Sequence, residues 1–232
     1  MQADGVFVLY FTAYATDNQG SHCIGAATSK DPAGPYQPAD QPIACRLGEG
    51  GVIDVSGFQD HDGTYYAVYK VDANNLGGGG ACGNGDLQRD TPIELQRLGS
   101  DALTPVGDPI RILSRDDSDG PLIEAPSLVR AADGTYVLFY SSHCFNSPEY
   151  DAKYATAPTV SGPYTKASQP LLNSGATLSS PGGVDIGPEG KRMLFHADKT
   201  AGDPSIRQTW SAEISIQGGQ VSIVEGQTVQ TA

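Results

Sequence analysis

One short pattern occurs four times along the chain: an acidic residue and a glycine, followed at once by an apolar stretch rich in aromatic residues. An acidic residue before glycine is typical of a tight turn, and short runs of Val, Tyr and Phe are typical of β-strands. The four copies occupy residues 4–11, 62–69, 133–140 and 189–196. The pattern therefore predicts four copies of one β-sheet unit.

A second motif extends the repeat into the later half of the unit. Gly34-Pro35-Tyr36 follows Gly5 by 29 residues, and Gly162-Pro163-Tyr164 follows Gly134 by 28 residues. Successive acidic-Gly turns are 58, 71 and 56 residues apart, which is room for four short strands with their turns. Repeated four-stranded meanders of this length are typical of propeller blades.

The sequence predicts an all-β fold, a single β-propeller domain over residues 1–232 with approximate blades at 1–50, 51–115, 120–175 and 180–228. Its 29 glycines and 16 prolines suit many short strands and turns rather than helices. The second unit is longer because of a glycine-rich segment at 74–85, where we expect a loop. A phosphate-binding loop is the alternative, but no Lys-Ser/Thr pair follows it.

Each blade should begin with the strand that precedes its acidic-Gly turn. These strands are expected at residues 52–58, 122–129 and 181–186. For the first unit, the corresponding strand would lie almost wholly before Met1, so we expect an N-terminally truncated propeller. Residues 1–10 lack the basic head of a signal peptide and are themselves expected to form a strand.

Two carboxylates interrupt the predicted innermost strands. Asp54 lies eight residues before Asp62, and Glu124 lies nine residues before Asp133, so we expect both in matching places, pointing at one axial pocket. An acidic residue flanked by apolar neighbours needs a reason to be there, although exposed strand-end carboxylates are the alternative. Two carboxylates that point into one pocket can have different pKa values, so that one stays ionised while the other keeps its proton. Such pairs catalyse glycoside hydrolysis. We expect Glu124 to hold a proton and Asp54 to remain charged.

These motifs resemble glycoside hydrolase family 43. The resemblance rests on residues 53–60 (Ile-Asp-Val-Ser-Gly-Phe-Gln-Asp), residues 123–128 (Ile-Glu-Ala-Pro-Ser-Leu) and the two Gly-Pro-Tyr turns, and it extends over essentially the whole chain. It implies a five-bladed propeller that acts on arabinose- or xylose-containing polysaccharides. By the same resemblance, Glu124 is the general acid, and Asp54 is the carboxylate that modulates the acid's pKa and orients substrate.

The chain also departs from the family pattern. The family usually has proline after the second carboxylate, where this chain has Val55. The first blade, whose opening strand carries the family's general-base Asp, is expected to be missing, and no Asp here is assigned to that role. The chain is therefore expected to be an inverting arabinofuranosidase or xylosidase type of enzyme that is inactive, or nearly so, as it stands.

Four further residues are candidates for contacting substrate. By the resemblance, His196 corresponds to an axial histidine that contacts a water or a structural Ca²⁺, and Arg207 to an arginine that reaches a sugar hydroxyl. His143 and Phe145 adjoin Cys144 and are candidates for the pocket rim. Ordinary strand-end or solvated roles are the alternatives. No cofactor is expected to be required.

Charge and cysteine content limit the partners and the compartment. The net charge of −13, from 27 acidic and 14 basic residues, disfavours nucleic acid and anionic membranes, and suits a neutral saccharide. We expect disulfides between Cys23 and Cys45 and between Cys82 and Cys144, with a zinc site as the alternative. Two disulfides would place the protein outside the cytosol, so we expect a secreted monomer.

Two functions of other classes compete with the enzyme. A non-catalytic carbohydrate-binding propeller would keep the pocket and tolerate the change Glu124→Gln. A protein-interaction propeller would use Asp54 and Glu124 only to solvate its channel, and would not need carboxylates within apolar strands.

Overall fold

The structure is a computed structural model that describes residues 2–3, 5–16, 20–86 and 89–230. Its β-strands form four antiparallel sheets of four strands, each a meander in which consecutive strands pair. The sheets are β1 (Gln2–Ala3), β2 (Val6–Tyr14), β3 (His22–Ser29) and β4 (Gln37–Pro38); β5 (Val52–Gln59), β6 (Tyr65–Val71), β7 (Ile93–Leu98) and β8 (Ile110–Leu113); β9 (Ile123–Arg130), β10 (Tyr136–Ser142), β11 (Asp151–Ala157) and β12 (Thr165–Lys166); and β13 (Gly182–Ile186), β14 (Arg192–Thr200), β15 (Asp203–Gln217) and β16 (Gln220–Gln230). Short 3₁₀ helices lie between strands: η1 (Leu47–Glu49), η2 (Ala73–Leu76), η3 (Ala81–Gly83) and η4 (Asp117–Asp119).

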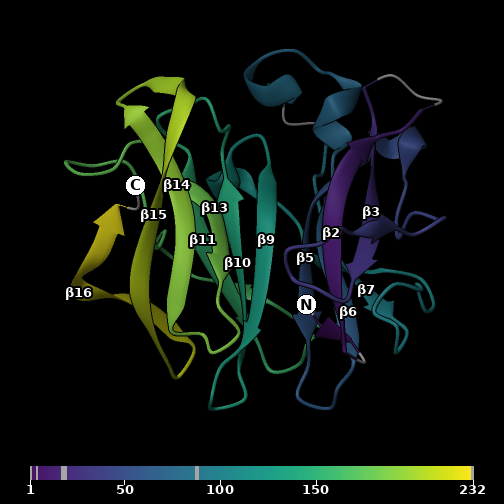
Figure 1. Cartoon of the computed structure of the whole chain (residues 1–232). Coiled ribbons are helices and arrows are strands. Elements are labelled where there is room, and N and C mark those ends of the chain that lie inside the picture. Colours follow the sequence, from purple (N-terminus) through teal and green to yellow (C-terminus); the bar gives the residue numbers. More distant parts are fainter. Residues whose placement is uncertain (1, 4, 17–19, 87–88, 231–232) are drawn as a thin grey trace.

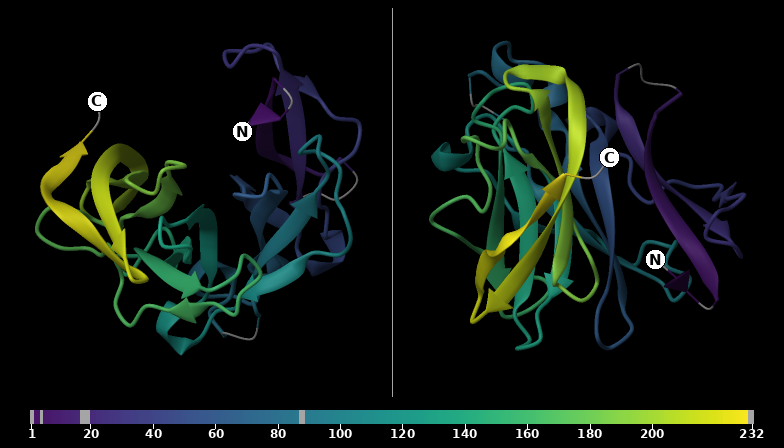
Figure 2. Two further views of the ribbon diagram at one scale, coloured as in Figure 1. Left: turned by 90° about the horizontal axis from the view of Figure 1, so that it is seen from below. Right: turned by 60° about the vertical axis from the view of Figure 1, so that its left-hand side comes forward.

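The sheets stand side by side along an arc, with their first strands on its concave side (Figure 1; Figure 2, left). The N-terminal and C-terminal sheets form the two ends of this arc, and in the described residues no further sheet joins them. The predicted all-β propeller is therefore confirmed, and the four sheets form an open rather than a closed ring. In the first sheet, the innermost strand β1 has only two residues.

The acidic-Gly turns form as the repeat predicted. Backbone N–H groups of Thr64 and Thr135 donate to the carboxylates of Asp62 and Asp133, at 2.9 and 3.0 Å. Gly63 and Gly134 have φ values of 85° and 92°, which favour glycine at those positions. Asp4, the acidic residue of the first copy, lies outside the described residues.

The two Gly-Pro-Tyr motifs also share one structure. Both Gly–Pro peptide bonds are cis. The following tyrosine, Tyr36 or Tyr164, donates its hydroxyl to the carbonyl oxygen four residues earlier, at 3.1 Å in both copies. The sequence repeat therefore corresponds to a repeated backbone path.

Apolar clusters between neighbouring sheets hold the arc together, because the faces of each sheet carry the alternating apolar side chains of its strands. Val8, Ile24, Val52 and Tyr69 lie between the first and second sheets. Val68, Leu128 and Leu138 lie between the second and third, and Phe139, Met193 and Phe195 lie between the third and fourth. Each sheet thus packs against the next, which fixes the relative positions of their inner strands.

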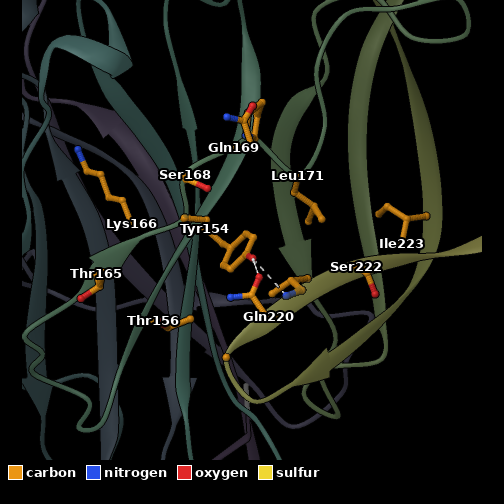
Figure 3. Close-up of a pocket in the computed structure, with 14 residues that line it drawn as sticks. Tyr154, Thr156, Thr165, Lys166, Ser168, Gln169, Leu171, Gln220, Ser222 and Ile223 are labelled. Carbon is orange, nitrogen blue, oxygen red and sulfur yellow. Dashed lines mark hydrogen bonds between the residues drawn. The ribbon is translucent and has the colours of Figure 1, made fainter.

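A hollow of about 680 Å³ lies between the outer strands of the third and fourth sheets (Figure 3). Tyr154 closes its base: its hydroxyl donates to Gln220 Oε1 at 3.4 Å and accepts the Val221 N–H at 3.3 Å. None of the predicted site residues lines this hollow. Its contacts serve to anchor the β15–β16 hairpin on β11.

Both predicted disulfides are confirmed, Cys23–Cys45 within the first unit and Cys82–Cys144 between the second and third. The second bridge joins the glycine-rich loop after β6 to the loop after β10. No cysteine is left for a zinc site. The bridges indicate an oxidising compartment, in agreement with the expected location outside the cytosol. No helix in the described part of the chain is long and apolar enough to cross a membrane.

Candidate active site

The innermost strands of the second, third and fourth sheets each contain a bulge at the same place. Their pairing with the second strand changes register between Ile53 and Ser56, between Glu124 and Ser127, and between Gly182 and Asp185. The residues at the bulge have positive φ: Asp54 (58°), Ala125 (50°) and Gly183 (62°). A bulge bends its strand and re-aims side chains, as often occurs beside active sites.

This register corrects the expectation that Asp54 and Glu124 occupy matching places. Glu124 pairs with Ser141, and the residue in its place on β5 is Ile53, which pairs with Lys70. Asp54 is instead equivalent to Ala125, since each lies eight residues before the aspartate of its turn. The two carboxylates therefore belong to successive positions of the repeat, on neighbouring sheets.

A backbone contact brings the two carboxylates together. Asp54 Oδ2 accepts a hydrogen bond from the N–H of Ala125, the residue after Glu124, at 3.0 Å. Burial, with the nearby charge of Glu124, raises the pKa of Asp54 to about 6. Asp54 was expected to remain charged; with this pKa it is mostly ionised at neutral pH and becomes protonated below about pH 6.

Two side chains hold the Glu124 carboxylate. The Tyr150 hydroxyl donates to Oε1 at 2.9 Å, and Lys70 Nζ lies 3.4 Å from Oε2. Burial and the charge of Glu124 raise the pKa of Tyr150 well above its usual value, so the hydroxyl remains a donor. A carboxylate held from both sides has a defined orientation, which general acid catalysis requires.

Lys70 is almost completely buried, with 1% of its surface exposed, and it also pairs with Asp72 at 3.0 Å. Burial alone would lower its pKa, but the charges of Glu124, Asp72 and Asp54 raise it. Lys70 is therefore a cation fixed beside the proposed acid. Lys70 was not among the residues predicted from the sequence, although a lysine at the end of an apolar strand was a usable signal. Tyr150 was not predicted either, and it lies in a loop outside the repeat.

Tyr150 connects the carboxylates to the other candidate residues. Its ring stacks on that of His196, with centroids 6.1 Å apart and planes 8° apart, and the Arg207 guanidinium lies 5.4 Å from its centroid. Two glycines make room for these rings: a Cβ on Gly182 would lie 2.2 Å from Tyr150, and one on Gly183 would lie 2.5 Å from His196 Nε2. The Gly-Gly pair is thus required by the packing.

The Arg207 side chain contacts several neighbouring residues. Its guanidinium donates to His196 Nδ1 at 2.8 Å, to the Ser180 carbonyl at 3.2 Å and to the Phe145 carbonyl, and it lies 3.5 Å from Asp198. Three of the four sequence candidates, Arg207, His196 and Phe145, therefore meet here. Phe145 keeps 47% of its surface exposed, which leaves an aromatic face available to a ligand.

His143 lies apart from this group. Its Nδ1 contacts the Ser142 hydroxyl at 3.0 Å, and its backbone N–H donates to the Asp119 carbonyl at 2.9 Å. It lines neither of the two cavities beside the carboxylates.

Asp54 and Glu124 line two adjoining cavities, in contrast to the single axial pocket that was expected: Ile53 and Glu124 line one, and the residues that follow them, Asp54 and Ala125, line the other. Asp54 lines an open axial cavity of about 580 Å³, together with Tyr10, Ser56, Asp185 and His196. Glu124 lines a second hollow of about 480 Å³, whose wall is completed by Lys70, Asp72, Asn74, Asn75 and Phe145. The physical reason is that the two carboxylates occupy successive positions of the repeat, and successive strand residues point to opposite sides.

The axial residues do not fit the structural Ca²⁺ that the family resemblance suggested. Calcium takes six to eight oxygen ligands. Of the carboxylates lining the axial cavity, Asp54 accepts the Ala125 N–H and Asp185 accepts the Ser127 hydroxyl at 3.3 Å. Within the described part of the chain, no cluster of three or more His, Cys, Asp or Glu residues could hold a metal ion.

Comparison with known proteins identifies the family. The family model for glycosyl hydrolases family 43 matches residues 1–219, nearly the whole chain. The chain belongs to this family. A search of curated proteins finds no match.

Several solved structures share its fold. A thermostable family-43 glycoside hydrolase is 26% identical, with a TM-score of 0.79 over 97% of this chain and 73% of that one. An endo-1,4-β-xylanase from Bacteroides thetaiotaomicron is 24% identical, with a TM-score of 0.71 over 95% and 76% of the two chains. An arabinanase from Bacillus subtilis is 20% identical, with a TM-score of 0.71 over 94% and 72%. The family-43 fold has five blades, and the described residues of this chain form four.

Proposed function

We propose that this chain is the larger part of a glycoside hydrolase that cleaves arabinan- or xylan-type saccharides, with Glu124 as its general acid. The observation that carries the proposal is the Glu124 carboxylate, held between Tyr150 and Lys70 at the wall of an open hollow, 3.4 Å or less from both. Family membership supports the reaction class, and the xylanase and arabinanase among similar structures support the substrate class.

In the proposed reaction, Glu124 protonates the departing glycosidic oxygen as the bond to the anomeric carbon breaks. Asp54, joined to the same segment through Ala125, supplies negative charge beside the developing oxocarbenium ion and holds substrate. An inverting enzyme needs a second carboxylate about 6.5–9.5 Å from the acid, to deprotonate the attacking water. We assign no described residue to this role and propose that the base comes from outside these 232 residues.

It follows that the chain alone should have little hydrolytic activity, because loss of a general base costs about 10²–10⁴-fold. The first experiment measures release of free pentose from methyl α-L-arabinofuranoside and methyl β-D-xyloside, whose leaving group needs protonation. It compares the chain, its Glu124→Gln variant and, as a matched control, a variant of the exposed turn residue Glu189→Gln. Residual activity that Glu124→Gln lowers and Glu189→Gln leaves unchanged supports the proposal.

The alternative is a carbohydrate-binding propeller, which the lack of an assigned base favours. Calorimetric titration with arabino- and xylo-oligosaccharides distinguishes the two functions. If the chain binds an oligosaccharide but shows no Glu124-dependent cleavage, even when an upstream blade is supplied, the binding function replaces the enzymatic one.

A further inference from the structure

His196 is held in one orientation by its neighbours. It lies on β14 opposite Gly182, its ring is stacked on Tyr150, and its Nδ1 lies 2.8 Å from a guanidinium nitrogen of Arg207. Arg207 is itself anchored by the Ser180 carbonyl, the Phe145 carbonyl and Asp198. The imidazole therefore cannot turn without breaking an anchored contact.

The contact with Arg207 decides where the imidazole carries its proton. A guanidinium has only donors and does not deprotonate in proteins, so Nδ1 must be the acceptor. A neutral imidazole that accepts at Nδ1 carries its hydrogen on Nε2. The ring is neutral at neutral pH, because burial and the charge of Arg207 lower the pKa of His196 to about 4.

The Nε2–H group points toward the axial cavity. It lies directly over Gly183, where a Cβ would come within 2.5 Å, and both residues line the cavity that also contains Asp54. Within the part of the chain that the structure describes, Nε2 has no hydrogen-bond partner, whereas Nδ1 is bound by Arg207. A donor without a protein partner at a cavity wall is available to a ligand.

We propose that His196 is a fixed hydrogen-bond donor to a neutral oxygen atom in the axial cavity, and that it does not ligate a divalent cation there. A protonated Nε2 has no lone pair to offer a metal, and the other nitrogen is bound by Arg207. The neutral oxygen comes from a water molecule or from a sugar hydroxyl. Because the proposal concerns binding chemistry, it holds whether or not the chain hydrolyses glycosides.

The repeat gives independent support. Lys70, Ser141 and His196 occupy one equivalent position, since they pair with Ile53, Glu124 and Gly182, each just before a bulge. Each of the first two uses its polar group toward the inner strand of the next sheet: Lys70 donates to Glu124, and the Ser141 hydroxyl accepts the Gly183 N–H at 2.9 Å. His196 therefore occupies the position whose equivalents in the two preceding sheets make polar contacts with an inner strand.

The test is long-range ¹⁵N–¹H NMR of the ¹⁵N-labelled chain, which distinguishes protonated from unprotonated ring nitrogens directly. The chain has four histidines, and the spectrum of the His196→Gln variant assigns the His196 signals by their disappearance. We expect the Nε2–H tautomer from neutral pH down to about pH 5. An Nδ1–H tautomer, or a ring protonated at neutral pH, would overturn the proposal.

Titrations with arabinose, xylose and their oligosaccharides identify the acceptor. Movement of the Hε2 resonance on titration assigns the acceptor to a sugar hydroxyl, and an unchanged Nε2–H signal assigns it to water. Addition of millimolar Ca²⁺ should leave the His196 signals and the Tm unchanged relative to EDTA. A saturable Ca²⁺-dependent shift that disappears in His196→Gln would show metal ligation and reject the proposal.

The role of Arg207 is tested with Arg207→Met, and Arg192→Met is its matched control on the adjacent strand, because the Arg192 guanidinium is exposed and pairs with Glu213 at 3.1 Å. Arg207→Met should give a mixture of tautomers and a higher His196 pKa, whereas Arg192→Met should change neither. If Arg207→Met folds and keeps the pure Nε2–H tautomer, Arg207 does not set it. If it fails to fold, the wild-type spectrum still decides the tautomer.

Discussion

Asp54 is a residue whose environment affects how stability varies with pH. Its pKa is raised from 3.8 to about 6, so the folded protein binds this proton more tightly than the unfolded chain does. The contribution of Asp54 to the free energy of unfolding should therefore be largest below about pH 4, and it should fall as the pH rises from about 4 to about 6. The raised pKa corresponds to a loss of at most about 3 kcal/mol.

The variant Asp54→Asn tests this pH dependence, because asparagine cannot ionise but can still accept the Ala125 N–H. We expect it to be more stable than the wild type at neutral pH, by up to about 3 kcal/mol, with the difference nearly absent at pH 4. Urea unfolding at both pH values measures it. A variant of the exposed Asp40→Asn should follow the wild type, and a pH-independent effect of Asp54→Asn would contradict the account.

Lys70 should be important for both stability and electrostatics. Replacement by methionine leaves Asp72 and Glu124 without their buried cation, which typically costs about 3–5 kcal/mol. It should also raise the pKa of Asp54 further, because Lys70 lowers it. Carbon-detected NMR of the Asp54 carboxyl measures the second effect. The exposed Lys199→Met is the control, and an unchanged Asp54 titration in Lys70→Met would contradict this role.

Local chemistry determined which site residues could be predicted from the sequence. Asp54 and Glu124 were predictable because a carboxylate within an apolar strand is unusual. Lys70 could have been predicted, since it lies eight residues after Asp62 as Ser141 does after Asp133. Tyr150 could not, because it reaches Glu124 from a loop whose path depends on tertiary packing.

The innermost strands were predicted, but their bulges were not. Predicting a bulge requires the pairing register, and the register depends on the partner strand. Because the bulges were not predicted, Asp54 and Glu124 were wrongly expected at equivalent positions of the repeat. Their spacings from the following turns, eight and nine residues, already differed.

The bulge on β13 gives a prediction at the level of the strand. A methyl group on Gly182 would lie 2.2 Å from the Tyr150 ring and 2.8 Å from the Ser141 hydroxyl. We expect Gly182→Ala to cost about 1–3 kcal/mol by overpacking and to weaken saccharide binding by displacing Tyr150 from Glu124. Urea unfolding and calorimetric titration measure the two effects.

Gly175→Ala is the matched control for that variant, because nothing lies within 4 Å of the added methyl group and its φ is not positive. It should change neither stability nor binding. If Gly182→Ala matches Gly175→Ala in both measurements, the tight packing of Tyr150 against β13 is not correct.

The two disulfides should contribute unequally to stability. Cys82–Cys144 closes a loop with a separation of 62 residues, and Cys23–Cys45 closes one of 22 residues. Chain-entropy arguments predict that removal costs about 4 kcal/mol for the longer loop and about 3 kcal/mol for the shorter one. Urea unfolding of the two double Cys→Ser variants measures the costs. The reverse order would show that loop entropy does not dominate.

At the level of the whole molecule, the repeat made the architecture predictable. Acidic-Gly and Gly-Pro-Tyr turns are set by short-range chemistry. The acidic-Gly turn recurs at the spacing of a four-stranded blade, and the Gly-Pro-Tyr turn occurs at the same place in the first and third units. The division between the axial cavity and the Glu124 hollow was not predictable, because residues of all four sheets line the first, and residues on or beside the second and third sheets line the other.

The central claim is that Glu124 protonates a leaving glycosidic oxygen in a site without its own base. Azide tests it most directly, because this anion attacks an anomeric carbon without needing a base. The measurement is glycosyl azide formation from methyl and 4-nitrophenyl pentosides, by the chain and by Glu124→Gln.

We predict azide-dependent turnover in the chain, and a loss of about 10²–10⁴-fold in Glu124→Gln with the methyl pentoside. The loss should be much smaller with 4-nitrophenyl, a leaving group that needs little protonation. Equal losses with both leaving groups, or azide-dependent turnover that Glu124→Gln leaves unchanged, would contradict the assignment of Glu124 as the general acid.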